Sequence, residues 1–264
     1  MIKKQNYLKH AIVLFLLLLL MQPERAWAAY ENVEFSSLTN HDGLTNSQVG
    51  AILKDTRGYI WFGTQSGLCR FDGFRMKTFY YINTDDKSLP NNSVDELQQD
   101  YGGNIWVHTS VGYCIYKYDE EQFERKPEEW LKNIHVQGPP YKLLIDKDKN
   151  MWIAVYGQGL YYHNAKTKNT YLFKFTKKAQ PGCLKEGNIS KITEVDGDAL
   201  ITYADGTICR VNGQKQKVLW YNSFLANHKA AGDNGAYTFY DGIGGFWVSV
   251  SNANYVYQSK TGKW

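Results

Sequence analysis

The stretch Asp55-Thr-Arg-Gly-Tyr-Ile-Trp61 decides the fold of this chain, because it recurs along the sequence at a nearly constant spacing. Its further copies all begin with an acidic residue, and they read DYGGNIW at 100–106, DKDKNMW at 146–152, EVDGDAL at 194–200 and DGIGGFW at 241–247. Counted from the acidic residue, the steps are 45, 46, 48 and 47 residues. A fixed period of about 40 to 50 residues with strand-like composition is typical of a propeller.

Each unit contains the same order of short, strand-like runs. In the first unit these runs are Val49–Leu53, Tyr59–Gly63, Leu68–Phe71 and Arg75–Tyr81. Runs of this length that are separated by Gly, Asn and Asp indicate strands in hairpins. The chain also has 20 Tyr, 12 Phe and 8 Trp, which favour strands. We therefore predict an all-β fold, a β-propeller built of about five four-stranded antiparallel blades.

An acidic residue and a glycine three positions later are predicted to close the first turn of each unit. The carboxylate accepts backbone N–H bonds two residues on, and glycine adopts a positive φ without a Cβ clash. Where Lys149 replaces the glycine, we expect Asn150 to take the left-handed conformation. The tryptophan is expected to fill the gap between blades. The structural residues predicted in this way are Asp55, Gly58, Trp61, Asp100, Gly103, Trp106, Asp146, Trp152, Asp241, Gly244 and Trp247.

The first 28 residues have the order of a secretory signal peptide. Three lysines precede an apolar run over residues 11–21, and the small-residue triplet Ala26-Trp27-Ala28 follows. The apolar run is shorter than the roughly 20 residues that a membrane helix needs. We therefore predict that residues 1–28 are removed by cleavage after Ala28. The mature chain is expected to be periplasmic or secreted, with no membrane span after the signal peptide.

The mature chain, 29–264, is predicted to consist of propeller repeats alone. The units cover approximately 30–82, 83–130, 131–178, 179–224 and 225–264. The last unit stops seventeen residues after Trp247, at a point that falls inside the fourth strand of the first unit. We favour an N-terminal fragment with an incomplete ring over a complete five-bladed ring or an open arc. In a complete ring, Tyr30–Phe35 could supply the missing outer strand.

Charge and cysteine content exclude several classes of protein. The 30 basic and 26 acidic residues become 26 and 25 without the signal peptide, and this balance gives no reason to expect a nucleic-acid partner. Four cysteines allow three disulfide pairings, and they are Cys69, Cys114, Cys183 and Cys209. Cys69 and Cys114 lie at equivalent positions of neighbouring blades, so we favour small buried side chains over disulfides.

The sequence contains no recognisable catalytic constellation. Adjacent carboxylates such as Asp85-Asp86 point to opposite sides of an extended chain, and the histidines are scattered. No spacing typical of a metal site occurs. We therefore predict a protein that is not an enzyme, with no metal and no cofactor. A propeller lyase or hydrolase stays as a less favoured alternative, because fold does not fix function.

A ligand is expected on one face of the repeats. The loops that enter each first strand and the loops between second and third strands share this face, because the strands alternate in direction. Amides, hydroxyls and aromatic rings suit sugars, and the candidate ligand-binding residues are Asn46, Gln65, Asn91, His108, Tyr156, Gln158 and Tyr203. We favour His108 and Tyr156, since both are expected to follow a buried strand directly.

The first unit resembles the two-component regulator propeller repeat. The segments DGLTNSQV at 42–49, DTRGYIWFGT at 55–64 and GLCRFDG at 67–73 follow the order of that family. The resemblance implies the periplasmic sensor region of a hybrid two-component histidine kinase. In such proteins two propellers, normally seven-bladed, and a small β-sandwich precede a membrane helix, a kinase, a receiver and a DNA-binding module. It also implies an oligosaccharide ligand for many members.

The predicted function follows from the repeats together with this resemblance. We expect a periplasmic propeller that senses a small molecule or an oligosaccharide for a two-component system. The sequence shows no phosphoacceptor histidine box or receiver aspartate, so its output would come from missing C-terminal signalling modules or from a partner protein. A homodimer is left open. The alternative is a secreted propeller that serves as a structural or protein-interaction scaffold.

Overall fold

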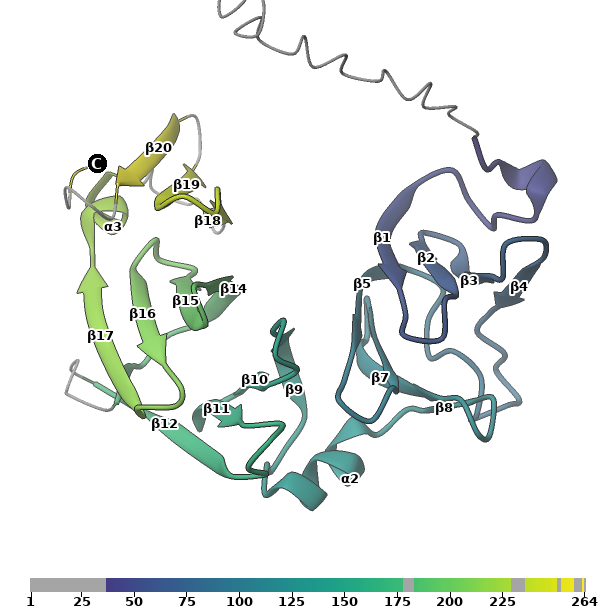
Figure 1. Ribbon diagram of the computed structural model, residues 1–264, viewed down its shortest axis with the longest axis horizontal. Coiled ribbons are helices and arrows are strands. Elements are labelled where there is room, and N and C mark those ends of the chain that lie inside the picture. Colours follow the sequence, from purple (N-terminus) through teal and green to yellow (C-terminus); the bar gives the residue numbers. More distant parts are fainter. Residues whose placement is uncertain (1–36, 178–182, 229–235, 251–252, 259–262, 264) are drawn as a thin grey trace, which may run out of the picture. The chain divides into compact units, whose positions relative to one another are not determined.

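The computed structural model describes residues 37–177, 183–228, 236–250, 253–258 and 263 (Figure 1). The chain divides into two compact units, Met1–Ser37 and Leu38–Trp264, and every described helix and strand lies in the second. The predicted signal peptide and the predicted outer strand Tyr30–Phe35 lie outside the described residues. The second unit is built mainly of antiparallel sheets, in agreement with the predicted all-β fold.

The first sheet shows the plan that the other sheets repeat. Its strands form an antiparallel meander in the order β1 (Val49–Lys54), β2 (Ile60–Thr64), β3 (Gly67–Phe71) and β4 (Met76–Phe79). Leu53 of β1 pairs with Trp61 of β2, and Phe62 of β2 pairs with Cys69 of β3. A short 3-10 helix, η1 (Asn40–Asp42), precedes the sheet.

The second and third sheets follow the same order. The second comprises β5 (Val94–Gln99), β6 (Ile105–Thr109), β7 (Gly112–Lys117) and β8 (Gln122–Glu124). The third comprises β9 (Pro140–Ile145), β10 (Met151–Val155), β11 (Gly159–His163) and β12 (Thr170–Thr176). A two-residue strand, β13 (Leu184–Lys185), pairs in parallel with the end of β12. The third sheet therefore extends beyond the predicted unit boundary at residue 178.

The last two sheets complete the described fold. The fourth comprises β14 (Ile189–Val195), β15 (Asp198–Tyr203), β16 (Ile208–Asn212) and β17 (Lys217–Asn222). The described strands of the fifth are β18 (Ala236–Tyr240), β19 (Gly245–Val250) and β20 (Ala253–Gln258). Short helices occur only between sheets in the described ranges, apart from η1, and they are α2 (Pro127–Leu131), η2 (Lys132–Ile134) and α3 (Phe224–His228).

Consecutive sheets pack against each other, and their first strands make many of the contacts between them. Strand β1 contacts β5, and β14 contacts both β9 and β18. Apolar side chains of both partners fill each interface. Trp61 of the first sheet packs with Leu97 and Val107 of the second, and Trp152 of the third packs with Ile192 of the fourth. The sheets are therefore propeller blades, as predicted.

The acidic residue of the first turn accepts more hydrogen bonds than the predicted turn requires. Oδ1 of Asp55 accepts bonds from the backbone N–H of Arg57 at 2.9 Å and of Tyr59 at 3.0 Å. Its Oδ2 accepts from the indole Nε1 of Trp61 at 2.7 Å and from the hydroxyl of Tyr118 in the second sheet. One carboxylate thus closes the turn, holds the tryptophan and joins two blades.

The second, third and fifth turns repeat this geometry in whole or in part. Asp100 accepts from the backbone N–H groups two and four residues later and from Trp106 at 3.0 Å. Asp146 makes the same bonds, with Trp152 at 3.3 Å. Asp241 accepts the two backbone bonds at 2.9 and 2.8 Å. These two bonds lower the pKa of the Asp241 carboxyl group.

The left-handed residue of each of these turns lies three positions after the acid. Its φ is 92° at Gly58, 86° at Gly103 and 110° at Gly244. In the third turn the expectation for Asn150 is wrong, because Lys149 itself has a φ of 64°. The buried Asn150 side chain instead donates to Asp146 at 3.1 Å and accepts from the backbone N–H of Ala165 at 3.0 Å. These bonds fix Asn150, so the strained conformation falls on Lys149.

The fourth turn is built differently from the prediction. Strands β14 and β15 are joined by the two-residue turn Asp196–Gly197, with φ values of 51° and 81°. Positive φ at both positions is typical of a type I′ hairpin. Glu194, predicted as the turn acid, lies in β14 and accepts from the backbone N–H of Lys147 at 2.8 Å. The buried carboxylate is that of Asp198, which accepts from Nε of Arg210 at 2.6 Å.

The repeated tryptophans differ in burial. Trp61, Trp106 and Trp152 are fully buried, whereas Trp247 is 49% exposed. Phe239, which pairs with Trp247 across β18 and β19, is also exposed. The predicted packing between blades is therefore seen at the first three tryptophans and not at Trp247.

The four cysteines are free thiols, and Cys69, Cys114 and Cys209 are buried. Burial raises the pKa of the thiols of Cys114 and Cys209. None of the helices in the described ranges combines the length and the apolar character that a membrane span needs.

Candidate ligand-binding site

The loops that enter the sheets and the loops between second and third strands lie on one face, as the strand order predicts. In the first sheet the backbone N–H of Gln65 donates to the carbonyl of Gln48 at 3.3 Å. In the second sheet the backbone N–H of Ser110 donates to the carbonyl of Ser93 at 3.2 Å. We call this side of the blades the entry face. The D-x-x-G turns lie at the opposite ends of the strands, on what we call the turn face.

Three of the predicted ligand-binding residues hold the loops of the entry face together. Nδ2 of Asn46 donates to Oγ of Ser66 at 2.9 Å. Oε1 of Gln65 accepts from Oγ of Ser93 at 2.9 Å, a bond that joins the first sheet to the second. Oδ1 of Asn91 accepts from the backbone N–H of Ser93 at 2.8 Å. A ligand contact by Asn46, Gln65 or Asn91 stays a prediction.

Two further predicted residues differ in their surroundings. Gln158 lies on the entry face, where Nε2 donates to the carbonyl of Gln137 at 2.9 Å and Oε1 accepts from the hydroxyl of Tyr161 at 2.5 Å. Tyr203 is only 1% exposed and belongs to the core between the third and fourth sheets. Its predicted place in a loop is wrong, because β15 continues through this residue and directs its ring inward.

The two favoured residues, His108 and Tyr156, line the same pocket. The pocket has a volume of about 380 Å³ and lies on the entry face where the second sheet meets the third. His108 belongs to β6 itself and does not follow the strand as predicted, whereas Tyr156 comes directly after β10. The other residues that line the pocket are Val111, Gly112, Tyr113, Arg125, Pro127, Glu128, Pro139, Pro140 and Tyr141.

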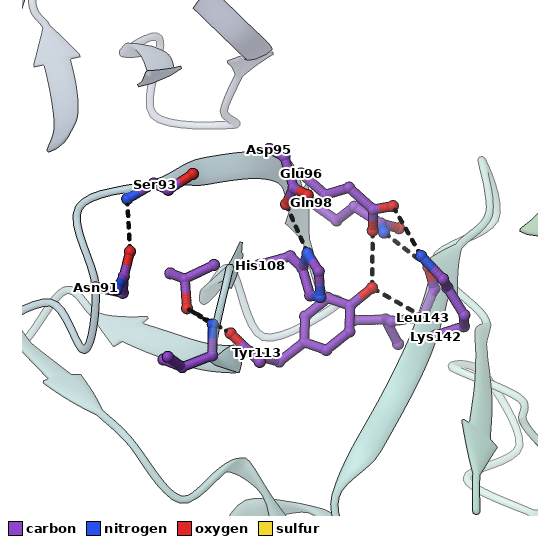
Figure 2. A network of polar contacts seen from close by, with 12 residues as sticks. Asn91, Ser93, Asp95, Glu96, Gln98, His108, Tyr113, Lys142 and Leu143 are labelled. Carbon is purple, nitrogen blue, oxygen red and sulfur yellow. Dashed lines mark hydrogen bonds and ion pairs between the residues drawn. The ribbon is translucent and has the colours of Figure 1, made fainter. Parts of the chain in front are cut away.

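Figure 2 shows the polar network that holds His108. Its Nδ1 lies 2.5 Å from Oδ1 of Asp95, and its ring lies 4.4 Å from the ring of Tyr113. The Tyr113 hydroxyl donates to Oε2 of Glu96 at 2.7 Å and accepts from the backbone N–H of Leu143 at 3.2 Å. Burial and the Glu96 carboxylate raise the pKa of Tyr113, so the phenol stays protonated. Because Leu143 lies in β9, this network connects the second sheet to the third.

A second tyrosine, Tyr141, supports the ring of Tyr156. The rings of Tyr141 and Tyr156 stack with their centroids 3.9 Å apart and their planes at 18°. Tyr141 is anchored in turn, because its hydroxyl accepts from the backbone N–H of Ile189 in β14 at 3.3 Å. Tyr156 is 67% exposed. The pocket therefore contains an exposed aromatic ring that is held in place by a second ring. Such a ring can pack against the C–H face of a ligand.

Arg125 and Glu128 add charge to the pocket, and neither was predicted from the sequence as a ligand-binding residue. Arg125 follows β8, and its guanidinium donates to the carbonyl of Ser88 at 2.9 Å and to Oγ of the same residue at 2.7 Å. Glu128 lies in α2. Both belong to the irregular segment between the second and third sheets. Because that segment lies outside the repeated pattern, no periodic signal marks its residues.

The described residues contain no cluster of three or more His, Cys, Asp or Glu side chains that could hold a metal ion. The residues that line the pocket contribute imidazole, phenol, guanidinium and carboxylate groups together with apolar surface. This set of groups can form hydrogen bonds, stack against a ring and pair with charge.

The first repeat matches a known family model. The match covers residues 43–66, and the family is described as Two component regulator propeller. These residues form a two-component regulator propeller repeat. The predicted resemblance is therefore confirmed. None of the curated proteins matches the chain.

Solved structures share the fold over most of this chain. The extracellular domain of BT3049 from B. thetaiotaomicron, described as a hybrid two component system, is 21% identical with a TM-score of 0.57, and the match covers 86% of this chain and 31% of that one. The extracellular domain of BT4673 from the same organism is 16% identical with a TM-score of 0.54, over 83% and 31% of the two chains.

A third structure belongs to a different system. PorZ, described as a surface component of the type-IX secretion system of Porphyromonas gingivalis, is 12% identical with a TM-score of 0.52, over 84% of this chain and 27% of its own. The chain thus spans less than a third of the length of each of these structures. At these identities the comparisons establish the propeller fold that the chain shares with them.

Proposed function

We propose that this chain is an exported, ligand-sensing propeller of a two-component signalling system. The family match over residues 43–66 supports this role, as does the fold shared with the extracellular domain of BT3049. The order of residues 1–28, which is that of a signal peptide, supports a location in the periplasm or outside the cell. Signalling output would come from modules or a partner protein outside residues 1–264.

The ligand we propose is an oligosaccharide, bound in the pocket between the second and third sheets. The observation that carries this proposal is that His108 and Tyr156, from different blades, line one pocket. The exposed ring of Tyr156, stacked on Tyr141, suits the apolar face of a sugar. The charged and polar groups of His108, Arg125 and Glu128 suit its hydroxyls.

We propose that the protein acts by binding and not by catalysis. A ligand that contacts His108 and Tyr156 together would bridge the second and third blades. Because a ligand shifts an equilibrium only by its different affinity for two states, such a bridge would favour the arrangement in which both residues face the pocket. A partner could read this arrangement as the signal.

Calorimetric titration of the purified chain with a panel of neutral oligosaccharides tests the proposal. At least one sugar should bind and raise the unfolding temperature, since it binds only the folded chain. The Tyr156→Ala variant should bind that sugar about tenfold more weakly, because it loses the stacking surface. Phe74→Ala provides the matched control, since Phe74 is an exposed aromatic residue of the turn between β3 and β4.

Two results would contradict the proposal. If the folded chain binds none of the sugars, an oligosaccharide is excluded as its ligand. A sugar that binds Tyr156→Ala and the unaltered chain with equal affinity would exclude this pocket as its site.

A further inference from the structure

A second hollow lies on the turn face, between the third and fourth sheets. Its volume is about 600 Å³. It is formed by the loop between β11 and β12, the loop between β16 and β17, and the turn at residues 146–150. We call it the turn-face groove. Its main lining residues are Tyr162, Asn164, Asn169, Tyr171, Gln214 and Gln216.

The floor of the groove is rigid. Tyr162 is 5% exposed, and its ring packs so closely on the next blade that a Cβ at Gly213 would lie 2.5 Å from it. Its hydroxyl accepts from Nδ2 of Asn164 at 3.2 Å. Because a phenol oxygen both accepts and donates, Tyr162 can still donate its own proton to a ligand. The buried Asn150 fixes the adjacent loop through its bond from Ala165 at 3.0 Å.

The walls of the groove carry neutral hydrogen-bonding groups. Asn169, Gln214 and Gln216 are exposed and line it from two separate loops. An amide offers one acceptor and two donors, a set that matches sugar hydroxyls.

The rim of the groove has an excess of positive charge. Lys166 lines it, and Lys215 lies between the lining residues Gln214 and Gln216. Both lysines are exposed, and neither forms an ion pair with any residue in the described ranges. Asp148 is the one carboxylate among the lining residues. Lys166 and Asp148 balance each other among the lining residues, and Lys215 on the rim adds one positive charge, which favours a ligand with negative charge.

We propose that the turn-face groove is a second ligand site, which binds an acidic oligosaccharide carrying carboxylate or sulfate groups. The amides and the Tyr162 hydroxyl bind sugar hydroxyls, the ring of Tyr171 covers a C–H face, and Lys166 and Lys215 pair with the acidic groups. The site is separate from the pocket of His108 and Tyr156, which lies on the opposite face of the blades.

Titration of the full chain with three probes of equal length tests this site. The probes are an oligogalacturonide hexamer, which carries carboxylates, a chondroitin sulfate hexasaccharide, which carries both groups, and neutral maltohexaose. At least one acidic probe should bind in physiological salt, and maltohexaose should bind the groove more weakly. The Lys166→Gln/Lys215→Gln variant should lose about tenfold in affinity for that acidic probe.

Control variants separate this site from general attraction and from the first pocket. Lys54→Gln/Lys87→Gln removes the same charge from exposed lysines of the first two units and should bind as the unaltered chain does. Tyr162→Phe keeps the packed ring and removes the hydroxyl, so affinity should fall about fivefold. Tyr156→Ala should leave the binding of the acidic probe unchanged. This expectation does not depend on whether the first pocket binds a sugar.

The proposal is overturned if neither acidic probe binds the unaltered chain. It is also overturned if both double lysine variants lose affinity equally, since the attraction would then be a property of the whole surface. If Tyr156→Ala no longer bound the acidic probe, the binding site of that probe would be the first pocket, and the proposal that it binds in the groove would be overturned as well.

Discussion

The indole Nε1 of Trp61 donates a hydrogen bond to Oδ2 of Asp55 at 2.7 Å, although Trp61 lies six positions further along the chain. The equivalent distances are 3.0 Å in the second sheet and 3.3 Å in the third. A tryptophan buried between blades needs a partner for its N–H group, and a buried carboxylate needs donors. The six-residue spacing satisfies both groups at once, so the turn and the interface between blades stabilise each other.

Removal of one turn carboxylate tests this coupling. We expect Asp100→Ala to lower the free energy of unfolding by about 2–4 kcal/mol, because it leaves the buried indole N–H of Trp106 and two backbone N–H groups without their partner. Urea denaturation measures the change. Asp86→Ala, at an exposed carboxylate, should stay within about 0.5 kcal/mol of the unaltered chain. Equal effects of the two substitutions would contradict the coupling.

The repeat and its strands could be predicted because their signals are local. The alternation of Val49–Leu53 and the acid, glycine and tryptophan of 55–61 recur in each clear unit, and β1 and β2 lie where these runs predict them. The bond between Asp55 and Trp61 was not predicted, although its constant six-residue spacing was visible in the sequence. Spacing alone does not show that the two side chains turn toward each other.

Other features depend on contacts that the sequence does not show. Glu194 matches the position of the turn acid, yet the two-residue turn Asp196–Gly197 closes the hairpin of β14 and β15. Of the candidate site, the sequence identified His108 and Tyr156. It could not show that Tyr141 supports Tyr156, because the two belong to separate strands whose pairing register decides which rings meet.

His163 should make stability depend on pH. It is 1% exposed, and its Nδ1 lies 2.9 Å from Oγ1 of Thr170, which itself donates to the carbonyl of Ile134 at 2.6 Å. Nδ1 therefore carries the proton, and the buried Nε2 has no hydrogen-bond partner among the described residues. Burial, with smaller effects of Lys168 and His135, lowers the pKa of His163 in the folded chain.

The sign of this effect follows from the lowered pKa. Above about pH 6.5 His163 is neutral in both the folded and the unfolded chain. As the pH falls below this value, the unfolded chain binds a proton that the folded chain excludes, so stability is lost until the folded pKa is passed. His163→Gln cannot titrate and should lose less stability between about pH 7 and pH 5. Urea denaturation at both pH values compares the two chains, and equal losses would contradict the role of His163.

Gln216 holds a backbone conformation that favours glycine. Its φ is 54°, in the turn between β16 and β17. We expect Gln216→Gly to raise the free energy of unfolding by up to about 1 kcal/mol, because it removes the clash of Cβ with the backbone. Gln214→Gly in the same turn, at a residue without a positive φ, should lower it by about 0.5–1 kcal/mol. Changes of the same sign in the two variants would show that backbone strain at Gln216 is not the cause.

The contrast between Trp152 and Trp247 predicts where the blades are most strongly coupled. Trp152 is 1% exposed and packs against the fourth sheet, whereas Trp247 is 49% exposed. We expect Trp152→Ala to lower the free energy of unfolding by about 3–5 kcal/mol through the cavity it leaves. Trp247→Ala should cost about 1–2 kcal/mol, because only part of its ring is removed from water. Urea denaturation of both variants gives the comparison, and equal costs would mean that the indole contributes through its turn and not through the interface between blades.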